Sequence, residues 1–269
     1  MKYLIDSHCH IYPDRIAEKA VEHIRHFYEG LAFAPFDGTR KTLREAGEAA
    51  GVTHFVVHSV ATTPAQVSSI NRFIAESQEL SQGAFIGLGA MHPQSENQER
   101  DLEEILSLGF HGVKLHPDTQ RFAVDGPEAF AIFELLEAKG VPVLVHTGDY
   151  RFDYSNPERV SHVLAHFPNL KMIGAHFGGW SVWDDAVRLL SDYPNFRVDT
   201  SSCSPWLSKE RAEEIIRAYG PERVMFGTDY PMWRPEPELA FVRSLDLTED
   251  ELEAICYKNC AEFYGITLE

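Results

Sequence analysis

The chain has 269 residues, of which 44% are hydrophobic and 24% are charged, and its 24 basic and 41 acidic residues give a net charge of −17. This acidity disfavours binding to nucleic-acid phosphates and to anionic membranes. No apolar run approaches the roughly 20 residues of a membrane span, and the first residues lack a secretory signal pattern. We therefore expect a cytoplasmic protein that acts on a small molecule, with no nucleic-acid or membrane partner, and with a homodimer as one possible assembly.

Eight short apolar runs, most of them rich in β-branched residues, alternate with amphipathic segments along the chain. Such runs predict strands at residues 3–8, 53–59, 84–90, 112–116, 142–146, 171–176, 196–200 and 224–228. The amphipathic segments predict helices at residues 102–108, 127–139, 157–166, 182–190 and 209–219. Glycines at positions 109, 140 and 220 directly follow helical segments, as C-terminal stops do.

Strands that alternate with helices in this way predict an α/β fold, specifically a (β/α)8 TIM barrel, with residues 1–269 as a single domain. A doubly wound sheet is the structural alternative, but it would need a glycine-rich turn after the first strand, and the sequence has none there. Residues 11–51 are too many for a plain connection and predict a helical insertion after strand one, with helices near 15–26 and 39–50. The apolar joint at 27–36 either roofs the active-site mouth or packs under the barrel rim.

The first strand ends in Asp6-Ser7-His8-Cys9-His10. Residues two apart on a strand point to the same face, so His8 and His10 are expected to project together. Imidazole is a common ligand for zinc and related ions, and a catalytic zinc keeps an open position. Cys9 should point to the opposite face and is not counted as a ligand.

Further side chains of the kinds that bind metal ions lie at the ends of the later strands, where barrel enzymes assemble their active sites. These residues are His58, His92, Lys114, His116, His146, His176 and Asp229. Other histidines fall on helical segments or at strand beginnings, and we interpret them as surface or structural residues: His23, His26, His54, His111, His162 and His166.

Six motifs in strand order resemble the amidohydrolase superfamily, and most closely its amidohydrolase-2 branch of metal-dependent hydrolases and decarboxylases. They are Asp6-Ser7-His8-Cys9-His10, Gly112-Val113-Lys114-Leu115-His116-Pro117, Val145-His146-Thr147-Gly148, Ala175-His176-Phe177-Gly178-Gly179, Phe226-Gly227-Thr228-Asp229-Tyr230-Pro231 and Asn259-Cys260-Ala261-Glu262-Phe263-Tyr264-Gly265.

The resemblance implies a role for each of five residues. His8, His10, His146 and Asp229 would bind a divalent metal, most readily zinc, with manganese as the alternative. Asp229 would also accept a proton from metal-bound water, and His176 would be the catalytic imidazole. The lysine on strand four, Lys114, bridges two metals in some relatives when it is carboxylated. The amidohydrolase-2 branch usually holds one metal, so we expect one per chain, with Lys114 binding substrate or a buried ion pair.

The leading functional hypothesis is a metal-dependent hydrolase that cleaves an ester, lactone or amide bond through metal-activated water. A metal-dependent non-oxidative decarboxylase, or a hydratase of an unsaturated acid, is the alternative. The least favoured hypothesis is a binding protein that contains a metal but is not catalytic. The expected loops after strands five to eight carry arginines that suit a carboxylate and aromatic residues that suit a ring, namely Asp149, Tyr150, Arg151, Trp180, Trp183, Ser202, Trp206, Tyr230, Trp233 and Arg234.

Overall fold

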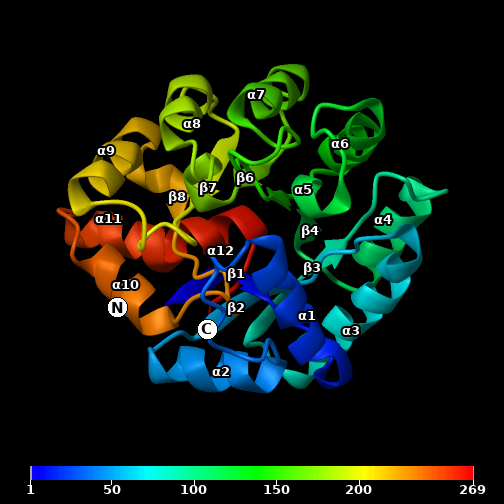
Figure 1. The fold of residues 1–269 in the computed structure, drawn as a ribbon, viewed down its shortest axis with the longest axis horizontal. Coiled ribbons are helices and arrows are strands. Elements are labelled where there is room, and N and C mark those ends of the chain that lie inside the picture. Colours follow the sequence, from blue (N-terminus) through cyan, green and yellow to red (C-terminus); the bar gives the residue numbers. More distant parts are fainter. Residues whose placement is uncertain (1, 269) are drawn as a thin grey trace.

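A computed structural model, which describes residues 2–268, places eight parallel strands side by side in chain order (Figure 1). The strands are β1 (Ile5–His10), β2 (His54–His58), β3 (Phe85–Ala90), β4 (Gly112–Leu115), β5 (Val143–Val145), β6 (Met172–Gly174), β7 (Phe196–Asp199) and β8 (Val224–Met225). The last strand returns to the first, because the backbone N–H of Ser7 donates to the carbonyl of Phe226 at 2.9 Å. The predicted TIM barrel is thereby confirmed.

Helices surround the strands as an outer ring (Figure 1). They are α1 (Asp14–Phe27), α2 (Arg40–Ala49), α3 (Val67–Leu80), α4 (Gln98–Ser107), α5 (Pro117–Gln120), α6 (Pro127–Lys139), α7 (Pro157–His166), α8 (Trp183–Leu190), α9 (Lys209–Tyr219), α10 (Pro235–Arg243), α11 (Glu249–Glu253) and α12 (Asn259–Tyr264). Local signals set their ends. The side chain of Ser208 accepts from the N–H of Arg211 to cap α9, and Gly140 ends α6 in the left-handed region at φ 65°.

The barrel interior is apolar at one end and polar at the other. Side chains from several strands form a buried cluster that includes Val56, Leu144, Ile173 and Met225, and residues of α12 pack against it. This cluster fills the end of the barrel near α12. The ionisable side chains that point inward are therefore gathered toward the opposite end, where the strands terminate.

A β-bulge in β1 decides which face His8 and His10 occupy. The pairing with β2 advances from Asp6 to Cys9 on β1 while it advances only from Phe55 to Val57 on β2. The extra residue reverses the alternation of side chains, so Ile5 belongs to the interior cluster while Cys9 packs in the outer core. Both histidines consequently point into the barrel, and the strand runs through His10 instead of ending at residue 8.

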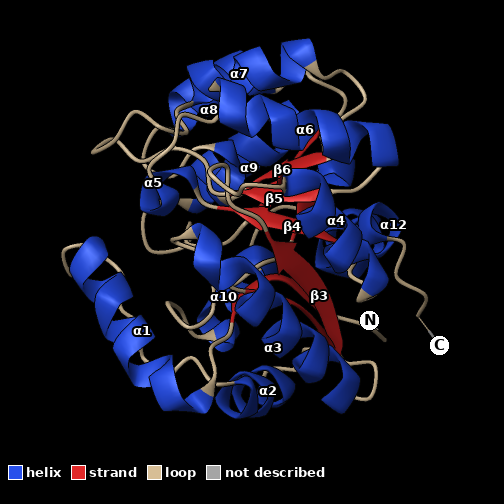
Figure 2. Ribbon diagram, turned by 90° about the vertical axis from the view of Figure 1, so that its right-hand side faces the viewer, coloured by secondary structure: helices blue, strands red, loops and turns tan. Residues whose placement is uncertain are grey.

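The long connection after β1 contains α1 and α2, and these helices agree closely with the two predicted in that segment. The α2 helix packs in the ring, with Gly47 against the ring of Phe55. By contrast, α1 lies apart from the ring, beyond the ends of the strands (Figure 2). The chain between them passes over the strand ends, where Tyr28 and Leu31 line a pocket that His176 also lines. Within residues 2–268, no helix has the length and apolar character that crossing a membrane requires.

Candidate metal and active site

Three ligand-type atoms converge at the ends of β1 and β8. The Nε2 atoms of His8 and His10 are 3.3 Å apart, and each lies 3.4 Å from Oδ1 of Asp229. Ligands about 2.0–2.2 Å from a tetrahedral zinc are separated by about 3.3–3.6 Å. Within the described residues, that carboxylate oxygen is buried and accepts no hydrogen bond. The three atoms therefore fit a divalent metal.

The hydrogen bond to Asp199 fixes the orientation of His8. Oδ2 of Asp199, the last residue of β7, lies 2.9 Å from Nδ1 of His8. A carboxylate only accepts, so Nδ1 carries the proton and Nε2 presents its lone pair to the site. Burial by itself raises the pKa of Asp199. The charge of His8 and its hydrogen bond outweigh burial and hold that pKa well below its usual range.

A second pair of imidazoles faces each other at the ends of β5 and β6. Nδ1 of His146 lies 3.1 Å from Nε2 of His176, whose Nδ1 donates to the carbonyl oxygen of Ser201 at 3.0 Å. On its other side, Nε2 of His146 is 3.3 Å from Oδ2 of Asp118. The close polar contacts of His146 are thus with His176 and Asp118. The predicted ligand set divides into His8, His10 and Asp229 on one side and His146, beside His176, on the other.

The buried Lys114 lies between strands that carry the histidines. Its Nζ atom is 3.1 Å from Nε2 of His8. Burial lowers the pKa of Lys114 to about 8, although the negative charges of Asp229 and Asp199 act to raise it. The amine thus competes with a metal ion for the His8 lone pair.

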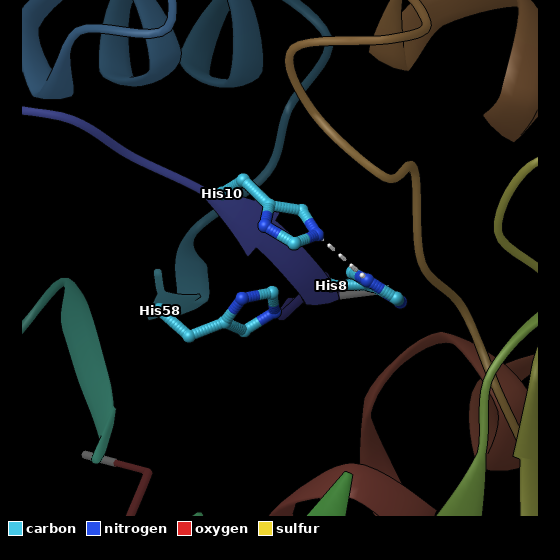
Figure 3. Close-up of side chains that lie close together, drawn as sticks. All are labelled: His8, His10 and His58. Carbon is cyan, nitrogen blue, oxygen red and sulfur yellow. Dashed lines mark hydrogen bonds between the residues drawn. The ribbon is translucent and has the colours of Figure 1, made fainter. Parts of the chain in front are cut away.

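His58 extends the histidine cluster onto β2 (Figure 3). Its ring centroid is 4.4 Å from that of His10 and 5.0 Å from that of His8. Both ring nitrogens are buried and have no hydrogen-bond partner within residues 2–268. Burial lowers the pKa of His58 well below its usual value, so the ring is neutral. Of the other strand-end histidines, His116 stacks on His146 at 4.0 Å.

Asp199 and Ser201 were missed in the sequence, whereas Ser202 was named only among the candidate loop residues. Asp199 and Ser201 orient His8 and His176, and the hydroxyl of Ser202 donates to Oδ2 of Asp229 at 2.6 Å. Their common signal is position, since Asp199 lies near the end of the predicted seventh strand and Ser201 and Ser202 directly follow it. A polar run at a barrel strand end could have identified them. Asp118 and Tyr28 gave no such signal.

A narrow aromatic and apolar pocket, with a volume of about 20 Å³, opens onto these residues. It is lined by His146, His176 and Asp229 together with Tyr28, Leu31, Ala32, Trp180, Ser202, Met232 and Trp233. Arg151 does not offer its guanidinium to this pocket. Its Nη2 donates to Oδ2 of Asp149 at 2.6 Å, its Nε to Oδ1 at 2.9 Å, and its Nη1 to the carbonyl of Phe27 at 2.8 Å. The suggested use of Arg151 as a carboxylate ligand is therefore wrong, because the arginine instead holds the end of α1.

A fold and site of this kind define a metal-dependent barrel enzyme, and the comparisons agree. The amidohydrolase model of the amidohydrolase-2 branch matches residues 5–266, so the chain belongs to that family. A curated relative, 2-amino-3-carboxymuconate-6-semialdehyde decarboxylase of Dictyostelium discoideum, is 26% identical over 239 residues. The match covers 73% of this chain and 66% of the relative, just under two thirds of its length.

Solved structures share the fold at low identity. An uncharacterised TIM-barrel protein from Bordetella bronchiseptica aligns with a TM-score of 0.82 at 19% identity, covering 98% of this chain and 99% of that one. A manganese-bound dihydroxybenzoic acid decarboxylase from Polaromonas sp. JS666 gives 0.75 at 15%, covering 100% and 98%. A structure titled as a 2-pyrone-4,6-dicarboxylic acid hydrolase from Pseudomonas putida gives 0.71 at 19%, covering 100% of both chains.

Proposed function

We propose that the protein is a metal-dependent, non-oxidative decarboxylase of a cyclic or unsaturated carboxylic acid. The observation that carries the proposal is a cleft of about 750 Å³ that reaches His8, His10, His176 and Asp229. Trp180 and Trp233 line a narrow space of about 20 Å³ beside His176 and Asp229, which gives this end of the site an aromatic wall. The curated relative is itself a decarboxylase of an unsaturated carboxylated acid. The proposal therefore favours the alternative from the sequence over the leading hydrolase hypothesis.

A divalent ion would be held by His8, His10 and Asp229, and we propose His146 as a further ligand. When bound, it would supply a positive centre that orients and polarises the oxygens of the acid. We propose one ion per chain. Manganese is favoured over zinc because a relative of the same fold is described with bound manganese.

The chain's own residues would orient the acid and move one proton. Burial raises the pKa of Asp229, but the neighbouring imidazoles of His8 and His10 outweigh burial and hold that pKa well below its usual range, so the carboxylate is ionised. It can accept a proton from a substrate hydroxyl and return it to the carbon that loses CO₂. That carbon–carbon bond breaks, its electron pair stays on the carbon, and the proton completes the product. His176 and Ser202 orient the reacting groups.

The experiment is to incubate manganese-loaded protein with 2,6-dihydroxybenzoate, 5-carboxyvanillate and 2-pyrone-4,6-dicarboxylate in separate reactions. Released CO₂ and released acid are measured in parallel. We expect CO₂ from at least one aromatic acid and no ring opening of the pyrone. Acid release from the pyrone without CO₂ would instead establish the hydrolase, which remains the second candidate because one structure of the same fold carries that title.

A further inference from the structure

A second, larger cleft leads outward from the site between α1 and α3. It is lined at its inner end by His8, His10 and Asp229 and at its outer end by side chains of the two helices. Its volume is about 750 Å³. An apolar cavity of about 150 Å³ is enough to hold benzene. The cleft is therefore several times larger than a single carboxylated ring requires.

Basic side chains of α1 face this cleft, whereas its acidic side chains do not. Arg15, Lys19 and His23 line it, and they lie one helical turn apart on one face of the helix. The acidic residues of the same helix, Asp14, Glu18 and Glu22, do not line it. Across the cleft, α3 contributes Arg72 and Glu76. Among residues 2–268, Glu76 is thus the one acid that lines this outer rim, and it lies opposite a stripe of bases, in a chain whose net charge is −17.

These cations are available to a ligand. Within residues 2–268, neither Arg15 nor Lys19 forms an ion pair, whereas Glu76 on the opposite wall is already paired with Arg40 of α2 at 3.2 Å. The remaining lining includes the apolar side chains of Ile24, Ile70 and Phe73 together with polar ones such as Thr62 and Gln66. The cleft thus joins a basic mouth to the histidine and aspartate centre through a stretch of mixed, partly apolar lining.

We propose that the cleft is the substrate channel of an elongated acid that carries a second anionic group, a carboxylate or a phosphate, at its far end. This inference rests on the proposed function, since it places the reacting carboxylated end at the centre. The apolar body lies along α1 and α3, and Arg15 and Lys19 hold the distal anion. Lys19 and Arg15 precede Phe27, at the inner end of α1, by eight and twelve residues, which is about 12 and 18 Å along the helix.

The length suggests a probe that cannot react. Dodecanedioate, a saturated diacid, and its monomethyl ester have the same body but differ by one terminal charge. Calorimetric titration of manganese-loaded protein should show that the diacid binds about 10-fold more tightly than the ester. A ω-phosphorylated acid of equal length, tested in a third titration, distinguishes a phosphate from a carboxylate as the preferred distal group. Raising the ionic strength should reduce the advantage of the diacid.

The decisive variant is Arg15→Gln combined with Lys19→Gln. It should erase the difference between diacid and ester while leaving benzoate affinity and metal content unchanged. Lys41→Gln is the matched control, because Lys41 is an exposed lysine on α2 that is paired with Glu45 at 3.8 Å and should have no effect. Equal binding of diacid and ester by the unaltered protein, or no binding of either, overturns the proposal. Failure of CO₂ release with the diacid preference intact would reject the decarboxylase and leave the channel.

Discussion

Replacing Asp199 with asparagine tests whether the site is built to hold a metal. Asp199 is fully buried and accepts from His8 Nδ1 and from the backbone N–H of His176, each at 2.9 Å. In Asp199→Asn, the amide oxygen can keep the bond from His176, which turns the amide NH₂ toward His8. Two donors then face each other unless His8 moves its proton to Nε2. That proton would point at His10 and remove one lone pair from the ligand set.

Loss of an orienting partner of this kind typically lowers metal affinity about 10- to 100-fold, or about 1.4–2.7 kcal/mol. The assay is a titration of apoprotein with Mn²⁺ in which free ion is followed by electron paramagnetic resonance, so that activity is not needed. Asp185→Asn is the control, because Asp185 is an exposed residue of α8 paired with Arg188 at 2.6 Å. If Asp199→Asn folds and binds Mn²⁺ as tightly as the unaltered protein, the proposed orienting role is wrong.

Two further variants test the chemistry and the electrostatics of the core. Asp229→Asn should lower turnover by about 10²–10⁴-fold because the amide cannot carry the proton, and turnover close to that of Asp185→Asn would refute the role. Burial raises the pKa of Glu238 to about 8 against the hydrogen bond from Ser204. The folded protein thus keeps a proton that the unfolded chain loses above about pH 4.3, and stability falls by up to about 1.4 kcal/mol per pH unit up to about pH 8. The free energy of unfolding in urea, measured for Glu238→Gln and for the unaltered protein, should therefore shift in favour of the variant as the pH rises from 5 to 8.5. A difference between the two proteins that does not change with pH would contradict this.

The fold could be predicted because its signals are local and repeated. Alternating strand and helix patterns recur along the chain, and capping residues such as Ser208 mark helix ends. The orientation of the first histidines depended on something less visible. The bulge between Asp6 and Cys9 turns His8 and His10 inward. It is defined by the pairing with β2, and no residue type in this stretch of sequence predicts it. The prediction that His8 and His10 share a face is therefore correct because the regular alternation of side chains holds for the residues after the bulge.

The site was less predictable, because sequence patterns identify residue types but not partners. Arg151 looked like a substrate ligand, yet Asp149, two residues before it, binds its guanidinium. Asp199, by contrast, looks like an ordinary strand residue in the sequence. Its role follows from a hydrogen bond with His8, which lies 191 positions away in the chain. Contacts over such distances are set by barrel closure. A single sequence contains no direct record of them.

The number of metal ions depends on the environment of Lys114. The donor atoms form two sets, His8 with His10 and Asp229, and His146 with His176, and a carboxylated lysine between them could bridge two ions. As an unmodified amine 3.1 Å from Nε2 of His8, however, Lys114 adds positive charge next to the first set whenever it is protonated. Two charges about 4 Å apart repel by about 4 kcal/mol at an effective dielectric constant of 20. This repulsion acts on an ion held by the first set, and the unmodified amine offers no oxygen that could bridge two ions, so a second dication is disfavoured.

We therefore predict about one manganese per chain by elemental analysis after dialysis, and the same content in Lys114→Ala with turnover reduced. The amine can also be tested directly, because carboxylation needs CO₂ and a neutral amine. Burial lowers the pKa of Lys114 to about 8, which makes the neutral form accessible near pH 9. Loading at that pH with bicarbonate should still give one ion if the lysine stays unmodified. Two ions per chain in the unaltered protein, but one in Lys114→Ala, would show that the bridge forms and that His176 is a ligand.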